Sequence, residues 1–290
     1  MWIIYSLLGA LADVIRDTLQ KKNTLHYSPI ASGFALNFLG ALICIPFVFY
    51  FGVPELKEGY WLATLVISFC GSLWPVFLSY ALKHEELSNV APLLALNPVL
   101  TTFVVMIVNH KTPPLLGSLG ILCVFLGLYI SRFDIKTLKT KGLIFPFIHM
   151  FSSLGSIAVI AVALCWSIGA VAANTIVHTS SPSFLVPTSL GGSAIVSFVI
   201  VLLFDRKFLK NFIRLIPRIL PFSIIQLISE YMVGLALATG FVPYVAAIKR
   251  SAIIGSTFAG IVVFKEKATI LKLIGVSVTF CGVVLIILTR

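Results

Sequence analysis

Six charged residues interrupt the apolar runs of this 290-residue chain: Asp13, Arg16, Asp17, Glu230, Lys249 and Arg250. On insertion scales a charge at membrane depth costs about 2.5–3.5 kcal/mol, so each of these residues needs a partner or a function. Lys249 and Arg250 are consecutive and have no acidic residue within one turn of their own helix. Two such cations can bind a carboxylate or a phosphate group. We therefore predict that Lys249 and Arg250 bind an anionic substrate.

The acidic residues suggest proton chemistry. Glu230 lies well inside a long apolar run, with Gln226 one turn before it. A carboxylate held away from water can bind and release a proton, so Glu230 is the first candidate for proton coupling and Asp13 is the second. A structural alternative stays open for both. Asp13 and Asp17 share a helix face with Arg16 and can pair with it, and Glu230 can form an ion pair of its own.

Uncharged side chains that could line a cavity at mid-depth form a third group. They are Asn37, Trp74 with the following Pro75, Asn97 with the following Pro98, and Trp166. A proline frees the backbone carbonyl one turn before it, and this carbonyl can meet a solute or permit a hinge. We therefore predict Asn37, Trp74, Asn97 and Trp166 as further substrate-binding residues. Alternatively, each tryptophan packs, each proline only kinks its helix, and each asparagine bonds across helices.

Several other chemistries lack their usual residues. The five histidines form no close-spaced ligand set and the five cysteines show no CxxC spacing, so we expect neither a metal site nor a disulfide framework. The sequence contains no GxGxxG or GxxxxGK[ST] phosphate loop, and we expect no cofactor. The 21 basic residues outnumber the 10 acidic ones but are spread between apolar runs. This distribution argues against nucleic-acid binding.

Membrane helices must position these residues. Hydrophobic residues make up 59% of the chain and charged residues 11%, and the mean hydropathy is +1.08. One helical crossing needs about 20 apolar residues. We therefore expect an all-α integral membrane protein with ten transmembrane helices, near residues 2–20, 28–51, 60–82, 88–109, 113–131, 151–177, 184–204, 217–238, 243–264 and 270–288.

The Lys and Arg residues between these segments are distributed unevenly. Three lie on the face that carries the termini, and fifteen lie on the opposite face. Cytoplasmic loops retain positive charge. We therefore predict a multi-pass protein of the plasma (inner) membrane, with both termini on the non-cytoplasmic side.

The two halves of the sequence are related. Corresponding positions recur at shifts of 153 to 155 residues: Ser28-Pro29 with Ser181-Pro182, and the pair Gly120 and Gly127 with the pair Gly275 and Gly282. We therefore predict two five-helix repeats, residues 1–140 and 141–290. Because five is an odd number, the second repeat must enter the membrane from the opposite side. Such inverted repeats are typical of transporters.

Three stretches carry a resemblance to a known family: Ser88-Asn89-Val90-Ala91-Pro92 leading to Asn97-Pro98, then Phe264-Lys265-Glu266-Lys267, and the Gly275 to Gly282 spacing. In these stretches the chain resembles the ten-helix EamA-type branch of the drug/metabolite transporter superfamily. The pair Lys249-Arg250 is also similar to the basic pair in the ninth helix of the triose-phosphate translocators, where the pair holds a phosphate group. The resemblance implies membrane transport and no enzymatic reaction.

We expect a secondary active transporter, either a permease or an exporter, that moves a small metabolite by alternating access. The basic pair favours an anion such as an amino acid, another carboxylate or a phosphorylated metabolite. The expected partners are this solute and membrane lipids, with coupling to a proton or another ion. The alternative is a membrane-embedded enzyme acting on a lipid substrate. Such an enzyme would need clustered catalytic acids or a Ser/Cys/His set, and neither is visible in the sequence.

Overall fold

The computed structural model of the chain describes residues 1–23, 29–84, 94, 96–131, 153–204, 212–250, 252 and 270–289. These residues form α-helices, one short 3-10 helix and connecting turns, and no strand occurs among them. The predicted all-α membrane fold is confirmed.

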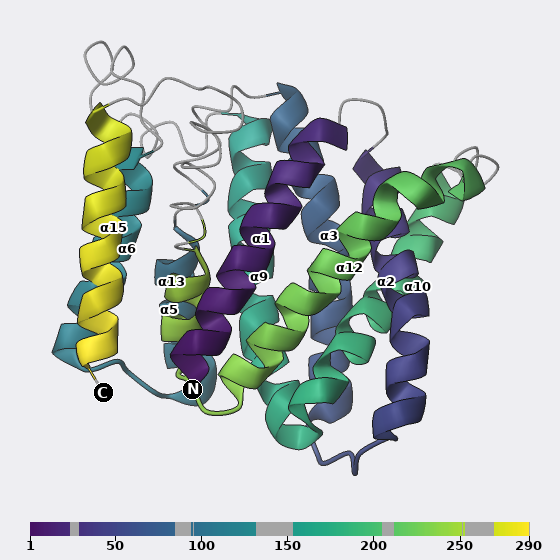
Figure 1. Cartoon of the computed structure of the whole chain (residues 1–290), viewed down its shortest axis with the longest axis horizontal. Helices are drawn as coiled ribbons and strands as arrows, with labels where there is room; N and C mark the ends of the chain where they lie inside the picture. Colours follow the sequence, from purple (N-terminus) through teal and green to yellow (C-terminus); the bar gives the residue numbers. More distant parts are fainter. Residues whose placement is uncertain are drawn as a thin grey trace. The chain divides into compact units, whose positions relative to one another are not determined.

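Figure 1 shows the helices, labelled and coloured along the sequence. Their bounds are α1 (Trp2–Asn23), α2 (Pro29–Phe51), α3 (Tyr60–His84), α5 (Asn97–Asn109), α6 (Leu115–Ser131), α9 (Leu154–Thr179), the 3-10 helix η2 (Pro182–Phe184), α10 (Leu185–Phe204), α12 (Phe212–Leu237), α13 (Val242–Arg250) and α15 (Ile270–Leu288).

Each predicted transmembrane segment coincides with one of these α-helices. Residues 88–93 of the fourth segment and 253–264 of the ninth lie outside the described residues. The largest difference is at α12, which begins five residues before the predicted start at Pro217 and continues through both Pro217 and Pro221. A proline removes one backbone hydrogen bond and kinks a helix, but a membrane helix tolerates this loss where neighbouring groups replace the bond.

Local signals in the sequence account for several helix ends. The side chain of Ser181 accepts a hydrogen bond from the backbone nitrogen of Phe184 at 3.2 Å, and Pro182 follows at the first position of η2. This is the usual chemistry of a helix start. α5 ends at His110, whose φ of 53° lies in the left-handed region that closes many helices.

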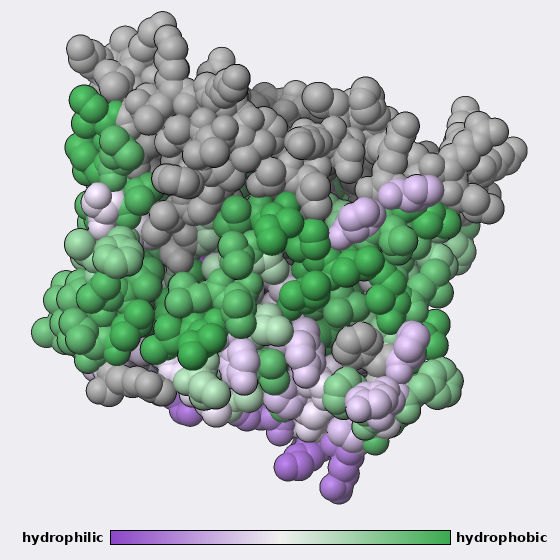
Figure 2. All heavy atoms as spheres, in the orientation of Figure 1, coloured by the Kyte–Doolittle hydropathy of each residue, from purple (hydrophilic) through white to green (hydrophobic). Residues whose placement is uncertain are grey.

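Five helical segments are long and apolar enough to cross a membrane: 33–51, 60–78, 154–179, 182–204 and 219–237. Shorter apolar helices occur at 2–15, 97–109, 115–130 and 273–288. Large apolar side chains are exposed along these helices, among them Phe49, Leu62 and Ile195. Figure 2 shows apolar side chains over most of the described surface of one face, next to a margin of hydrophilic residues. A surface of this kind is suited to lipid and not to water.

The described chain divides into two compact units, and unit 1 contains residues 1–76 and 168–240. In unit 1, α1 packs along α12, and α2 packs against α10 (Figure 1). Small residues allow α3 and α10 to approach closely. A Cβ added to Gly71 would overlap the hydroxyl of Ser193, and a Cβ added to Gly192 would overlap the hydroxyl of Ser68. This packing of small and hydroxyl side chains is typical of membrane helix bundles.

Unit 2 contains residues 77–167 and 241–290. Its main pairs are α6 with α15 and α5 with α13. The glycines that mark the two repeats lie at the first interface. A Cβ added to Gly127 would lie 2.6 Å from the carbonyl oxygen of Gly275, and one added to Gly282 would lie 2.7 Å from that of Gly120. Only glycine permits this approach of two helix backbones.

Each compact unit draws helices from both predicted repeats. Unit 1 combines α1 and α2 with α10 and α12, and unit 2 combines α5 and α6 with α13 and α15. The unit boundaries therefore differ from the predicted repeat boundary near residue 140. A repeat is a relation of sequence, whereas a compact unit is a set of packed helices, so the repeats 1–140 and 141–290 stay a prediction.

Candidate functional site

Arg250 is the last residue of α13 and lies in unit 2 with two of the predicted substrate-binding residues. Its Nε donates a hydrogen bond to Oδ1 of Asn97 at 2.9 Å. Its guanidinium carbon lies 3.8 Å from the centre of the Trp166 ring, a cation–π contact. Arg250, Asn97 and Trp166 come from α13, α5 and α9, so three segments distant in sequence hold one guanidinium group. We call this cluster the Arg250 site.

The amide of Asn97 is oriented by its own partners. Its Nδ2 donates to the hydroxyl of Ser167 at 3.0 Å and to the carbonyl of Ala163 at 3.4 Å. Because the nitrogen side of the amide is occupied by these two acceptors, the oxygen side points to Arg250. Asn97 is 3% exposed, and a buried amide with several partners keeps one orientation.

Two buried hydroxyls complete the cluster. Thr101 donates to the backbone carbonyl of Asn97 at 2.8 Å, and its hydroxyl lies 3.2 Å from that of Ser167. Ser167 in turn is within 2.8 Å of the carbonyl of Ala163. Neither Thr101 nor Ser167 was among the predicted substrate-binding residues. The available signal was position: Thr101 lies one helical turn after Asn97, and Ser167 follows Trp166 directly.

The described charged residues of unit 2 are all of one sign. Among its described residues, all the charged ones are basic: Lys83, Lys111, Lys249, Arg250 and Lys272. The acidic residues of this unit's sequence, Glu85, Glu86, Asp134 and Glu266, lie outside the described residues. A guanidinium presents N–H donors in a planar fork that matches a carboxylate or a phosphate. The arrangement is therefore suited to an anion.

Lys249 precedes Arg250 on α13 and is partly buried. Consecutive helical residues point about 100° apart. Lys249 therefore faces a different direction from Arg250. Its predicted substrate role stays a prediction.

The first coupling candidate, Glu230, lies in α12 of unit 1. Its carboxylate accepts a hydrogen bond from the hydroxyl of Ser189 at 2.5 Å and another from the amide nitrogen of Gln226 at 2.8 Å. Both donors are neutral, unlike the ion pair of the structural alternative. A serine hydroxyl can donate to a carboxylate and can also accept from a carboxylic acid. This shell can therefore serve Glu230 in either protonation state.

The second candidate, Asp13, lies on α1 and is 3% exposed. Its Oδ1 accepts a hydrogen bond from Ser229 at 2.7 Å, and Ser229 directly precedes Glu230 on α12. The two coupling candidates thus have partners on adjoining residues of one helix. The side chains of Arg16 and Asp17 lie outside the described part of the chain, so pairing within α1 remains an alternative for Asp13.

The remaining candidates, Asn37 and Trp74, lie in unit 1, where the structure connects Asn37 with Pro75. Pro75 has no N–H, so it cannot donate to the carbonyl of Gly71, one turn before it. Nδ2 of Asn37 donates to this same carbonyl at 3.3 Å and also to the hydroxyl of Ser197 at 3.1 Å. Asn37 therefore compensates for the proline of α3, which is a structural function. Trp74 lies beside this position and is partly buried, and the substrate roles of Asn37 and Trp74 stay predictions.

Within the described residues, no group of three or more His, Cys, Asp or Glu side chains could hold a metal ion. The chemistry available in the described clusters is ion pairing, hydrogen bonding and proton exchange.

Comparison with known proteins places this geometry in context. Residues 1–133 match the EamA-like transporter family. No curated protein matches the chain. Among solved structures, 29 chains match. One of them, described only as a crystal structure of a protein, covers 100% of this chain and 98% of its own, with a TM-score of 0.74 and 15% sequence identity. At this identity the likeness shows the fold alone.

Proposed function

We propose that this chain, whose residues 1–133 match the EamA-like transporter family, is a secondary active transporter that carries a small organic anion across the membrane by alternating access. The match to this family and the apolar helices support a multi-pass membrane protein. The substrate class and the coupling are the new elements of the proposal.

The observation that carries the proposal is the fixed guanidinium of Arg250. Asn97 orients its Nε and the Trp166 ring covers one of its faces. A group that is already oriented loses little conformational freedom when it binds, so more of the contact energy remains as affinity. Amino acids and other carboxylates are the first substrate class, and phosphorylated metabolites are the second, because both fit a guanidinium fork.

Coupling is assigned to unit 1. Glu230 takes up a proton in one orientation of the transporter and releases it in the other, and Asp13 is the second candidate for this function. The shell of Ser189 and Gln226 supports this assignment, because a neutral hydroxyl and a neutral amide can hydrogen bond to a carboxyl group with or without its proton. A transporter of this kind uses the proton gradient to move the solute against its own gradient.

The test of the substrate site is a thermal-shift screen of the purified protein against amino acids, other carboxylates and phosphate esters. A ligand at 100 times its Kd stabilises the folded protein by about 2.7 kcal/mol. If Arg250→Gln weakens binding 100-fold, the same concentration gives only about 0.4 kcal/mol. The ligand-induced stabilisation of Arg250→Lys should lie between these two values, because lysine keeps the charge and loses the planar fork.

The matched control is Lys57→Gln, which removes one exposed positive charge from a loop of unit 1. It should leave the ligand-induced shift unchanged. Equal shifts for wild type, Arg250→Gln and the control would refute the anion site. Mass spectrometry of the recovered solute also separates transport from enzymatic conversion, because a transporter returns the compound unaltered.

The coupling assignment is tested by Glu230→Gln in proteoliposomes. The variant should lose accumulation against a gradient and retain exchange of labelled solute, because exchange needs substrate passage without net proton movement. Loss of folding and of both assays would identify Glu230 as a structural residue. Full accumulation by a stable variant would move the coupling function to Asp13.

A further inference from the structure

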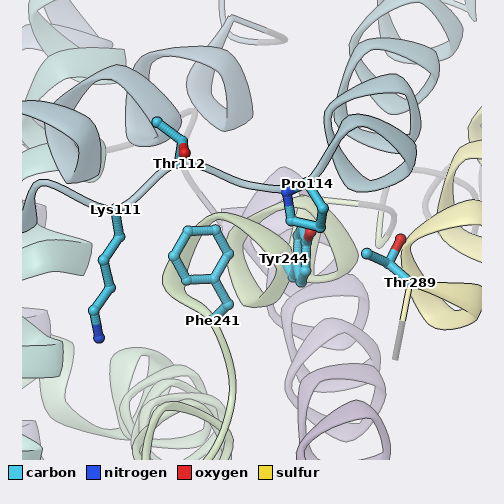
Figure 3. Close-up of a pocket in the computed structure, with 6 residues that line it drawn as sticks. All are labelled: Lys111, Thr112, Pro114, Phe241, Tyr244 and Thr289. Atoms are coloured by element: carbon cyan, nitrogen blue, oxygen red, sulfur yellow. The ribbon is translucent and has the colours of Figure 1, made fainter.

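A pocket lies in unit 2, apart from the residues of the Arg250 site. Its volume is about 430 Å³, within the usual range for small-molecule sites. Figure 3 shows its lining residues, which come from the α5–α6 connection, the start of α13 and the end of α15: Lys111, Thr112, Pro114, Phe241, Tyr244 and Thr289. The sequence analysis assigned no function to any of them.

The backbone on both sides of the pocket is fixed by local structure. His110, with φ of 53°, ends α5 and turns the chain towards Lys111 and Thr112. Two prolines follow, and the hydroxyl of Ser118 lies 3.2 Å from the carbonyl of Pro114, which ties this connection to the first turn of α6. Because a proline restricts its own φ and its neighbour's conformation, Lys111 and Thr112 leave a short and rigid connection.

The aromatic wall of the pocket is also preformed. Phe241 and Tyr244 pack edge to face with ring centres 5.1 Å apart, and the nitrogen of Tyr244 donates to the carbonyl of Phe241 at 2.9 Å. Gly117 of α6 makes room for the Tyr244 ring, since a Cβ there would lie 2.9 Å from its Cε1. In Figure 3 the two rings lie between Lys111 and Thr289.

The chemistry of the lining defines a ligand class. Lys111 supplies the one charge among the lining residues, Thr112 supplies a hydroxyl donor, and Phe241, Pro114 and the ring of Tyr244 supply apolar surface. The hydroxyl of Thr289 donates to the carbonyl of Leu285 at 2.8 Å, so Thr289 mainly contributes shape. A carboxylate or phosphate on an apolar body fits these features, with its charged group at Lys111 and its body on the rings.

We propose that this pocket is a second binding station for the anion that the Arg250 site carries. Tyr244 and Arg250 lie on the same nine-residue helix, and the rise between them is about 9 Å. α13 therefore contributes a residue to each site, Tyr244 near its start and Arg250 at its end. The inference rests on the proposed function for the identity of the ligand, whereas the existence of the pocket site is independent of it.

The experiment uses radiolabelled 3-phenylpropionate, a carboxylate on an apolar body, and the full chain in phosphatidylcholine nanodiscs. Wild-type protein should bind two equivalents. Lys111→Gln and Arg250→Gln should each bind one, and the double variant should bind none. Lys111 is exposed, so its substitution should not disturb folding, and Lys57→Gln serves as the matched control with two equivalents.

The outcomes separate the two proposals. If Lys111→Gln loses one bound equivalent and Arg250→Gln loses none, the pocket site is supported and the proposed substrate site is refuted. Two equivalents bound by Lys111→Gln refutes the pocket site. An anionic lipid headgroup has the same chemistry, so a second series uses nanodiscs with added phosphatidylglycerol. If this lipid alone occupies the Lys111 pocket and 3-phenylpropionate does not bind there in phosphatidylcholine, the pocket is a lipid site and the station is refuted.

Discussion

Asn37 and Pro75 should be energetically coupled, because both act on the carbonyl of Gly71. Pro75 removes the helical donor of this carbonyl, and Asn37 replaces it from α2. In Pro75→Ala the new backbone N–H can donate to Gly71 in the ordinary i to i−4 pattern. The amide of Asn37 then becomes less important at this position, although its bond to Ser197 remains.

The magnitude follows from the two bonds. Interhelical hydrogen bonds in membranes contribute about 0.6 kcal/mol on average and up to about 1.7 kcal/mol, and a buried acceptor left without a donor costs about 1–3 kcal/mol. We therefore expect Asn37→Leu, which keeps the side-chain size, to destabilise the protein by about 1–3 kcal/mol. In the Pro75→Ala background the cost should be smaller by about 1 kcal/mol, roughly a fivefold difference in the unfolding equilibrium.

The assay is a double-mutant cycle of equilibrium unfolding in detergent micelles, with helical content as the signal. Ser197→Ala is the control, because it removes the other partner of Asn37 and should cost the same in the wild-type and Pro75→Ala backgrounds. Additive effects of Asn37→Leu and Pro75→Ala would refute the reasoning. They would mean that Gly71 is satisfied in another way and that Asn37 does not compensate for the proline.

Three further predictions concern other parts of the chain. Gly127→Val should prevent close packing of α6 with α15 and lower the yield of folded protein several-fold by size-exclusion chromatography, whereas Gly191→Ala, which meets open space, should be neutral; equal yields would contradict this account. Tyr60→Phe removes a 2.8 Å hydrogen bond to Thr188 and should lower stability by about 0.6–1.7 kcal/mol in the same unfolding assay, and an unchanged midpoint would show that the bond contributes nothing. A reporter that is active only in the cytosol should be silent when fused to Arg290, because the positive-charge distribution predicts a non-cytoplasmic C-terminus, and an active reporter would reverse this orientation.

The sequence was most informative about the helices and about charge at depth. Apolar runs predicted the ten α-helices that the described residues form, because the hydrocarbon core imposes a length that composition reveals directly. The cost of burying a cation singled out Arg250, and the structure brings it together with Asn97 and Trp166. What the pattern could not supply was the contact between segments more than 80 residues apart.

The sequence could not distinguish the contacts of similar residues, and the reason is physical. In the sequence Asn37 and Asn97 look alike, because each is an asparagine within an apolar run. In the structure the amide of Asn37 replaces the hydrogen bond that a proline removes from its helix, and the amide of Asn97 orients an arginine. Only the three-dimensional partners distinguish the two. Thr101 and Ser167 were missed because small hydroxyl residues are common in membrane helices and usually bond to their own backbone.

The pairing of α6 with α15 has a consequence for the origin of the chain. The contact between Gly120 and Gly282 becomes the contact between Gly275 and Gly127 when each residue is replaced by its counterpart 155 positions away. A contact set that exchanges its members in this way is isologous, the form found where two identical subunits meet across a twofold axis. The interface therefore has the pattern expected if the two predicted five-helix repeats descend from one chain that formed a homodimer and later became fused. In such an ancestor one glycine pair was enough to build both halves of the contact, and one mutation would have changed the contact at two places.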